Sequence, residues 1–88
     1  MTTPSLMIPT IHLNGTSRES LTEGYEKAVE AMAAAIAAVG GTSPNARDFY
    51  PQGSDAFNQA AVQHQARMVR LREVEQELQQ LHEAVALA

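Results

Sequence analysis

Two polar segments of this 88-residue chain hold the residue types that can recognise an anion. The first, Asn14-Gly15-Thr16-Ser17, places an amide and two hydroxyls directly before a helix-forming stretch. Free backbone N–H groups and the positive end of the helix dipole meet at such a start and attract phosphate. An ordinary turn followed by a helix cap has the same residues, so this segment alone leaves both interpretations open.

The second segment lies in the loop 42–53 and contains Arg47, Asp48, Phe49 and Tyr50. An arginine can bind phosphate with two hydrogen bonds. Asp48 can accept from a base edge or a ribose hydroxyl, and Tyr50 can stack on a base. The structural alternative is that Arg47 and Asp48 fix the loop while the two rings close the end of a helix pair. A plain connector needs only about 2–8 residues, so this loop is long for that task.

His64 and Arg67 lie one turn apart on a helix face that is otherwise expected to pack inward. Because a buried, unpaired arginine is costly, they either meet acidic groups or line a cavity that admits an anion. His12 alternates with Thr10 on one side of an extended segment and can donate to a ligand. The candidate ligand-binding residues are Thr10, His12, Asn14, Gly15, Thr16, Ser17, Arg47, Asp48, Tyr50, His64 and Arg67.

Catalytic and cofactor signals are weak throughout the sequence. No serine stands beside a base, and the three histidines are too scattered for a metal site. The chain has no cysteine, which excludes a disulfide framework and a zinc ribbon. Neither glycine-rich nucleotide-binding fingerprint is present. We therefore expect no catalytic residue, no metal, no cofactor and no turnover.

The apolar spacing predicts two helices, over about 17–39 and 54–86, with a loop at 40–53 and an extended arm at 1–15. Thr16 is expected to cap the first helix with Glu19 reaching back, and Gly40-Gly41 to end it. Pro9 confines the arm to an irregular extended segment or an edge strand. The first helix carries apolar residues at spacings of three and four: Leu21, Tyr25, Ala28, Val29, Met32, Ala35, Ile36 and Val39.

The second helix carries a heptad seam at Leu71, Val74, Leu78, Leu81 and Val85. Traced backwards, the seam passes through Arg67, His64, Ala60 and Phe57. The predicted fold is all-α: a two-helix antiparallel hairpin with an extended N-terminal arm, assembled as a homo-oligomeric helical bundle.

Composition favours this assembly. Hydrophobic residues make up 44% of the chain, but 15 of them are alanine and only four are Phe or Tyr. Because alanine buries little surface, the expected core is small. A chain of this size buries only about 60% of its unfolded surface, and small scaffolds without staples commonly oligomerise. The net charge of −4 argues against a protein that coats nucleic acid. The N-terminus lacks a signal-peptide pattern and no apolar run is long enough for a membrane span, so we expect a cytoplasmic protein without membrane contact.

The expected hairpin separates the two polar segments. A helix of about 22 residues spans about 33 Å, so the segments lie at opposite ends of one chain. They meet only if a second chain packs antiparallel, because a two-fold axis places the first segment of one chain near the second segment of its partner.

Two motifs carry a resemblance to known proteins. Ile8-Pro9-Thr10-Ile11-His12-Leu13-Asn14-Gly15-Thr16-Ser17 and Pro44-Asn45-Ala46-Arg47-Asp48-Phe49-Tyr50-Pro51-Gln52-Gly53 resemble small, mostly uncharacterised tailed-phage proteins. In build the chain is also similar to phage sponge proteins, which counter bacterial defence. This resemblance implies a small, oligomeric, non-catalytic protein that sequesters cyclic nucleotides or ADP-ribose-derived immune signals at subunit interfaces.

The sequence therefore leads to a preferred function and two competitors. We expect a phage-encoded protein, acting in the cytoplasm of the infected host, that binds a nucleotide messenger of a defence system such as CBASS or Thoeris. The first competitor is a structural or assembly coiled-coil adaptor, which the heptad seam favours. The second is an enzyme that cleaves such nucleotides, for which no base or metal site stands out.

Overall fold

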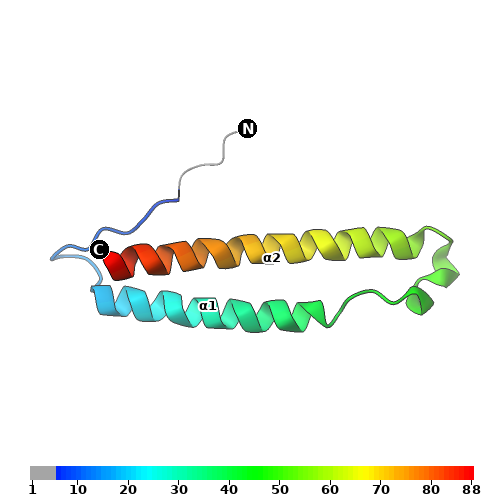
Figure 1. Cartoon of the computed structure of the whole chain (residues 1–88), viewed down its shortest axis with the longest axis horizontal. Helices are drawn as coiled ribbons and strands as arrows, with labels where there is room; N and C mark the ends of the chain where they lie inside the picture. Colours follow the sequence, from blue (N-terminus) through cyan, green and yellow to red (C-terminus); the bar gives the residue numbers. More distant parts are fainter. Residues whose placement is uncertain (1–5) are drawn as a thin grey trace.

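The computed structural model describes residues 6–88, which form a hairpin of two long antiparallel helices (Figure 1). Helix α1 spans Arg18–Gly40 and α2 spans Ala56–Leu87. Two short 3₁₀ helices, η1 (Ala46–Asp48) and η2 (Tyr50–Gln52), shape the connecting loop. The predicted all-α hairpin is confirmed, with helix ends within two residues of those expected. The part of the predicted arm at 1–5 lies outside the described residues, and 6–12 have no regular secondary structure.

Helix α1 begins one residue later than the predicted cap. Ser17 is the N-cap, and its Oγ accepts a hydrogen bond of 3.1 Å from the backbone N–H of Ser20. The expectation that Thr16 caps the helix with Glu19 reaching back is therefore wrong. With Ser17 as the cap, the residue three positions ahead is Ser20. Its side chain is too short to reach back to the backbone N–H of the cap, as a glutamate does in a capping box.

A tight turn precedes this cap. The backbone N–H of Gly15 donates to the carbonyl of His12 at 3.1 Å. The His12 ring folds over the turn, so a Cβ added at Gly15 would lie 2.7 Å from Nε2 of His12. The turn predicted at Asn14-Gly15 is present, and the exposed His12 ring lies against it.

Helix α1 ends at Gly40, as predicted, but without a left-handed residue. Gly41 keeps a right-handed φ of −69°, and its N–H binds the carbonyls of Ala37 and Ala38. The Thr42 hydroxyl then donates to the carbonyl of Val39 at 2.6 Å. A side chain thus satisfies a carbonyl that the helix leaves free.

The seam between the helices differs from the predicted one at two positions, Arg67 and Val74. Arg67 is exposed and Val74 is 42% exposed, whereas their neighbours Met68 and Glu75 are buried and half-buried. The predicted and observed seams share Leu71, Leu78 and Val85. They differ in which of two neighbouring residues, Arg67 or Met68, faces α1, and it is Met68. The buried and half-buried residues of α2 are Ala56, Phe57, Ala60, Ala61, His64, Met68, Leu71, Glu75, Leu78, Leu81, His82, Ala84 and Val85.

Helix α1 presents the predicted apolar face, with one exception. Ala35 is exposed, so its place on that face is wrong, while Ala28 is half-buried. No residue of α1 is fully buried. The other half-buried apolar residues are Leu21, Tyr25, Val29, Met32, Ile36 and Val39.

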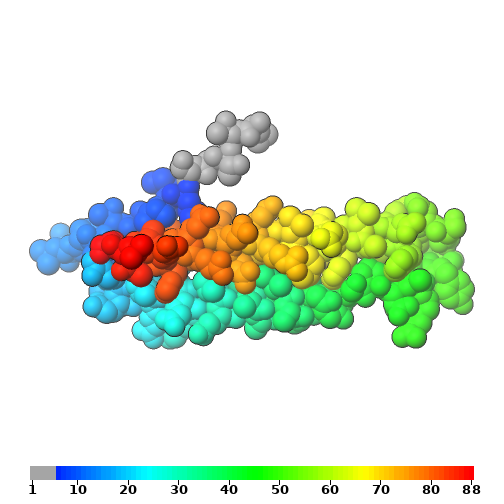
Figure 2. Space-filling model, viewed as in Figure 1, coloured from blue at the N-terminus to red at the C-terminus, as the bar shows by residue number. Residues whose placement is uncertain are grey.

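The resulting core is thin. Met68 and Val85 are the buried hydrophobic residues within 6–88. The molecule is correspondingly elongated (Figure 2), with a radius of gyration of 18.4 Å, against about 12 Å for a compact domain of this length. No helix within the described residues combines the length and apolar character needed to cross a membrane. Two helices of this size cover each other on one side only.

Candidate functional site

A cavity of ≈ 330 Å³ lies at the tip of the hairpin, between the connecting loop and α2. Gly40 at the end of α1 faces Met68, because a Cβ at Gly40 would lie 3.8 Å from the Met68 methyl. The α2 residues 56–67 therefore extend past the end of α1, and the loop covers them instead. The cavity occupies this place, and it is lined by Thr42, Ser43, Pro44, Asn45, Asp48, Phe49, Ala60, Gln63 and Arg67.

Local hydrogen bonds give the cavity wall its shape. The Asn45 side-chain oxygen accepts from the backbone N–H of Arg47 at 3.1 Å, which starts η1. The N–H of Phe49 then binds the Ala46 carbonyl at 3.1 Å. After η2 the chain turns at Gly53, whose φ of 124° is the one positive value in the described residues. Asn45, η1 and Gly53 together hold the loop over α2.

The two aromatic rings of the loop have different environments. Phe49 is half-buried and lines the cavity, whereas Tyr50 is 74% exposed. The structural alternative, in which both rings close the hairpin end, therefore holds for Phe49 and not for Tyr50. An exposed tyrosine ring remains accessible for stacking on a planar ligand.

Arg67 is the cation of this cavity. It makes no ion pair within residues 6–88, where the one salt bridge joins Lys27 to Glu23 at 3.0 Å. The two readings for Arg67 both assumed a buried guanidinium, whereas Arg67 is exposed and lines the cavity. Asp48 lines the same cavity, and Arg47 is exposed on η1. A free guanidinium beside amide and hydroxyl groups is a site for an anion that also carries hydrogen-bonding groups.

His64 lies on the same turns of α2 but not among the lining residues. Its side chain is only 9% exposed, and Nδ1 has no hydrogen-bond partner within the described residues. Leaving a buried polar group unpaired costs about 1–3 kcal/mol. His64 is thus a buried polar group whose hydrogen-bonding capacity the hairpin does not use.

The other candidate residues lie at the opposite end of the molecule. Thr10, His12, Asn14, Gly15, Thr16 and Ser17 belong to the arm and the start of α1, and all are exposed. Figure 1 shows this segment beside the C-terminal end of α2, with the loop at the far end of the hairpin. Within one chain the structure therefore brings together Asp48 and Arg67, and it leaves the arm residues apart from them.

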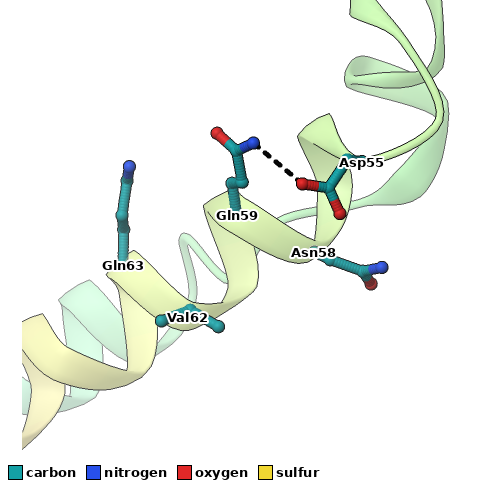
Figure 3. A pocket seen from close by; sticks show the side chains of 5 residues that line it. All are labelled: Asp55, Asn58, Gln59, Val62 and Gln63. Carbon is teal, nitrogen blue, oxygen red and sulfur yellow. Dashed lines mark hydrogen bonds between the residues drawn. The ribbon is translucent and has the colours of Figure 1, made fainter.

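Three other hollows lack a free cation. One beside the start of α2, ≈ 340 Å³, is lined by Asp55, Asn58, Gln59, Val62 and Gln63, and the Asp55 carboxylate accepts from Gln59 at 2.9 Å (Figure 3). Another, ≈ 370 Å³, has three glutamates and Arg18, whose guanidinium donates to the Ala88 carbonyl. The third, ≈ 150 Å³, lies between the helices at Glu26, Val29, Glu30, Gln79 and His82.

The two ends of the hairpin carry opposite charge. The tip half, residues 36–72, holds four arginines against two aspartates, a net charge of +2. The arm half, residues 6–35 and 73–88, holds one arginine and one lysine against eight glutamates, a net charge of −6. The two values add to the −4 of the whole chain. A field of this kind draws an anion to the tip rather than to the arm end.

Sequence reasoning missed the uncharged polar residues of the cavity wall. Thr42, Ser43, Asn45 and Gln63 supply hydroxyls and amides there. Asn45 could have been singled out as a turn-forming residue directly after Pro44. Nothing in the sequence around Gln63 marks it as a cavity residue. No group of three metal-ligating side chains is gathered within residues 6–88.

Comparison of the chain with models of protein families, with curated proteins and with solved structures gives no match. The function is therefore argued from the geometry of this chain.

Proposed function

We propose that this chain is a non-catalytic binding protein that sequesters a small nucleotide messenger. The cavity at the hairpin tip carries this proposal, because its Arg67 is free of ion pairs and lies among amide and hydroxyl groups. Arginine suits a phosphate, and Asn45, Asp48 and Gln63 suit a base edge or ribose hydroxyls. The exposed ring of Tyr50 suits base stacking.

The size of the cavity favours a site shared between chains. Ligand pockets commonly measure about 300–1,000 Å³, so ≈ 330 Å³ accommodates part of a cyclic dinucleotide. In the proposed site, an antiparallel second chain completes the pocket with Thr10, His12, Asn14, Gly15, Thr16 and Ser17.

The biological setting follows from the same proposal. A protein that binds a messenger without turnover lowers its free concentration in proportion to its own abundance. The resemblance of the two loop motifs to tailed-phage proteins supports an anti-defence role in an infected bacterium. The messenger is then a cyclic oligonucleotide or an ADP-ribose derivative of the host's immune system.

The experiment is a calorimetric titration of the full chain with cyclic dinucleotides and with cyclic ADP-ribose isomers. We expect binding to at least one of them, and the ligand should be recovered intact after heat denaturation. Arg67→Gln should weaken binding at least about tenfold, since a charged hydrogen bond contributes about 1.5–3 kcal/mol. The matched control is Arg72→Gln, which changes another exposed arginine of α2 outside the cavity.

Absence of binding to every probe, or equal weakening by both variants, would remove the proposal. Recovery of a cleaved nucleotide would instead indicate an enzyme. Because both arginine side chains are exposed, neither variant should unfold the hairpin. Circular dichroism of both variants checks this.

A structural or assembly adaptor is the second candidate, and the thin core favours it. The described residues bury only Met68 and Val85 among hydrophobic side chains, so the helices have surface left for other chains. Tyr50→Ala separates the two functions. In a binding protein it weakens nucleotide capture at unchanged mass in solution, and in an adaptor it changes the assembly itself.

A further inference from the structure

The α2 helix carries more apolar surface than α1 covers. Leu71, Leu78 and Val85 face α1 and are buried or half-buried. The alternate members of the same apolar seam, Val74 and Leu81, lie to one side of the contact. Val74 is 42% exposed and Leu81 is half-buried. The corresponding inward places hold two polar residues, Glu75 and His82, which are half-buried. The hairpin thus leaves Val74 exposed and Leu81 partly exposed on one flank of α2.

The matching flank of α1 is lined with small residues. Gly24, Ala31, Ala35 and Ala38 follow one another at helical spacings and are exposed. A Cβ added at Gly24 would meet nothing within 4 Å. The distance between packed helices depends on the side chains at the contact, so small residues permit a close approach.

Both flanks lie on the same side of the hairpin. On α1, Glu26 and Glu30 lie on the opposite side from Ala31 and Ala35, and they share a hollow with Gln79 of α2. Gln79 in turn lies across the inward seam from Val74 and Leu81. Since the polar flanks of the two helices meet at that hollow, their apolar flanks meet on the other side. We call this surface the small-residue face; it comprises Gly24, Ala31, Ala35 and Ala38 of α1 and Val74 and Leu81 of α2.

We propose that the small-residue face is where a second copy of this chain docks, in antiparallel orientation. The opposite net charges of the two halves favour a second copy as the occupant and favour an antiparallel orientation. In an antiparallel pair, each tip half of net charge +2 lies beside an arm half of net charge −6. A parallel pair places the two arm halves together, which is unfavourable for like charges. A two-fold axis then puts the same face of both copies in contact.

The inference deepens the proposed function, because it supplies the arrangement in which the tip of one copy reaches the arm of the other. A monomeric chain that still binds a nucleotide would overturn the face and the shared pocket but not the binding function. A dimer that binds no nucleotide would overturn the binding function alone.

The test compares two valines of α2 by analytical ultracentrifugation of the full chain without ligand. Val74 is 42% exposed on the small-residue face, and Val69 is 44% exposed on a different side of the helix. We expect the unaltered chain to sediment with a mass of at least two copies of 9.5 kDa. Val74→Glu should raise the dissociation constant at least about tenfold, which is about 1.4 kcal/mol. Val69→Glu should leave the dissociation constant unchanged.

Three outcomes overturn the proposal. These are a monomeric unaltered chain, equal weakening by the two variants, and weakening by Val69→Glu alone. Because both side chains are exposed, neither variant should unfold the hairpin, and circular dichroism checks that each keeps its helix content.

The orientation of the two copies is tested by cross-linking. Because the chain has no cysteine, a maleimide reacts only at the cysteine that a variant introduces. Ser54→Cys lies at the tip end of the hairpin and Ala88→Cys at its other end, and both positions are exposed. A short bis-maleimide should join the two variants when mixed, and should not join Ser54→Cys to itself. Self-linking of Ser54→Cys at the rate of the mixture would indicate a parallel pair and overturn the proposal.

Discussion

The two ends of the hairpin are made from the same kind of helix and differ in how they are closed. At the arm end, Ser17 caps α1 and Arg18 binds the Ala88 carbonyl, so the two helix termini contact each other. At the tip, α1 stops at Gly40 and α2 continues alone beneath a loop. Both ends have a hollow, and the two hollows differ in charge: the one at the arm end is lined by three glutamates and Arg18, and the one at the tip by Arg67, Asp48 and uncharged polar groups. The lower density of negative charge at the tip is the reason for proposing the anion site there and not at the arm end.

The largest effect is expected where the tip is joined to the helix pair. Met68→Ala removes a side chain that is 6% exposed and faces Gly40. We expect the free energy of unfolding to fall by about 2–5 kcal/mol, since a buried methionine leaves a cavity. Urea denaturation at a fixed chain concentration measures it. Val69→Ala, at a 44% exposed neighbour, should change it by less than about 0.5 kcal/mol. Similar losses in both variants would contradict the assigned seam.

A smaller effect, of opposite sign at the two ends, is expected for two glycines. Gly53→Ala in the tip loop forces a side chain into φ 124° and should destabilise by about 1–3 kcal/mol. Gly24→Ala in the arm half of α1 meets open space within its own chain and should stabilise the single hairpin by up to about 1 kcal/mol, measured at a chain concentration below that at which copies associate. Thermal unfolding of both variants against the unaltered chain measures the two signs. A stable Gly53→Ala variant would show that the loop does not need its turn.

The smallest effect is expected at the arm end. Ser17→Ala removes the oxygen that accepts from Ser20 and should cost about 1 kcal/mol of helix stability. Thr16→Ala, one residue earlier, makes no hydrogen bond to the helix start and should be nearly neutral. Urea denaturation of the pair decides which residue is the cap. A loss confined to Thr16→Ala would restore the cap expected from sequence.

The sequence was sufficient for the hairpin because each helix has its own local signals. Apolar spacing, the glycines at the end of α1 and Pro44 after it fix the helix bounds to within two residues. It was insufficient for the seam, since Arg67 and Met68 occupy alternative positions of one heptad pattern. Only the placement of α1 decides between them, and that is a property of two helices packed together.

The candidate site divides in the same way. Asp48 was found from its charge beside the two rings of the loop, and Arg67 from a charge at an expected inward position of the second helix, one turn from His64. Gln63 and Asn45 were not singled out, because an uncharged polar residue on a helix or in a loop has no distinctive spacing. His64 was placed on the inward face from its heptad position, and it is indeed buried. Its unpaired nitrogen depends on the neighbours that packing provides, which periodicity does not describe.

The early end of α1 has a consequence for ligand size. Residues 56–67 of α2, about 18 Å of helix, project beyond Gly40, and the depth of the tip cavity depends on this overhang. Adding or removing one turn in the alanine-rich end of α1 would shift the stop by about 5.4 Å. The length of α1 therefore sets the depth of the tip cavity. A chain with a longer or shorter α1 would have a shallower or deeper cavity with the same lining residues.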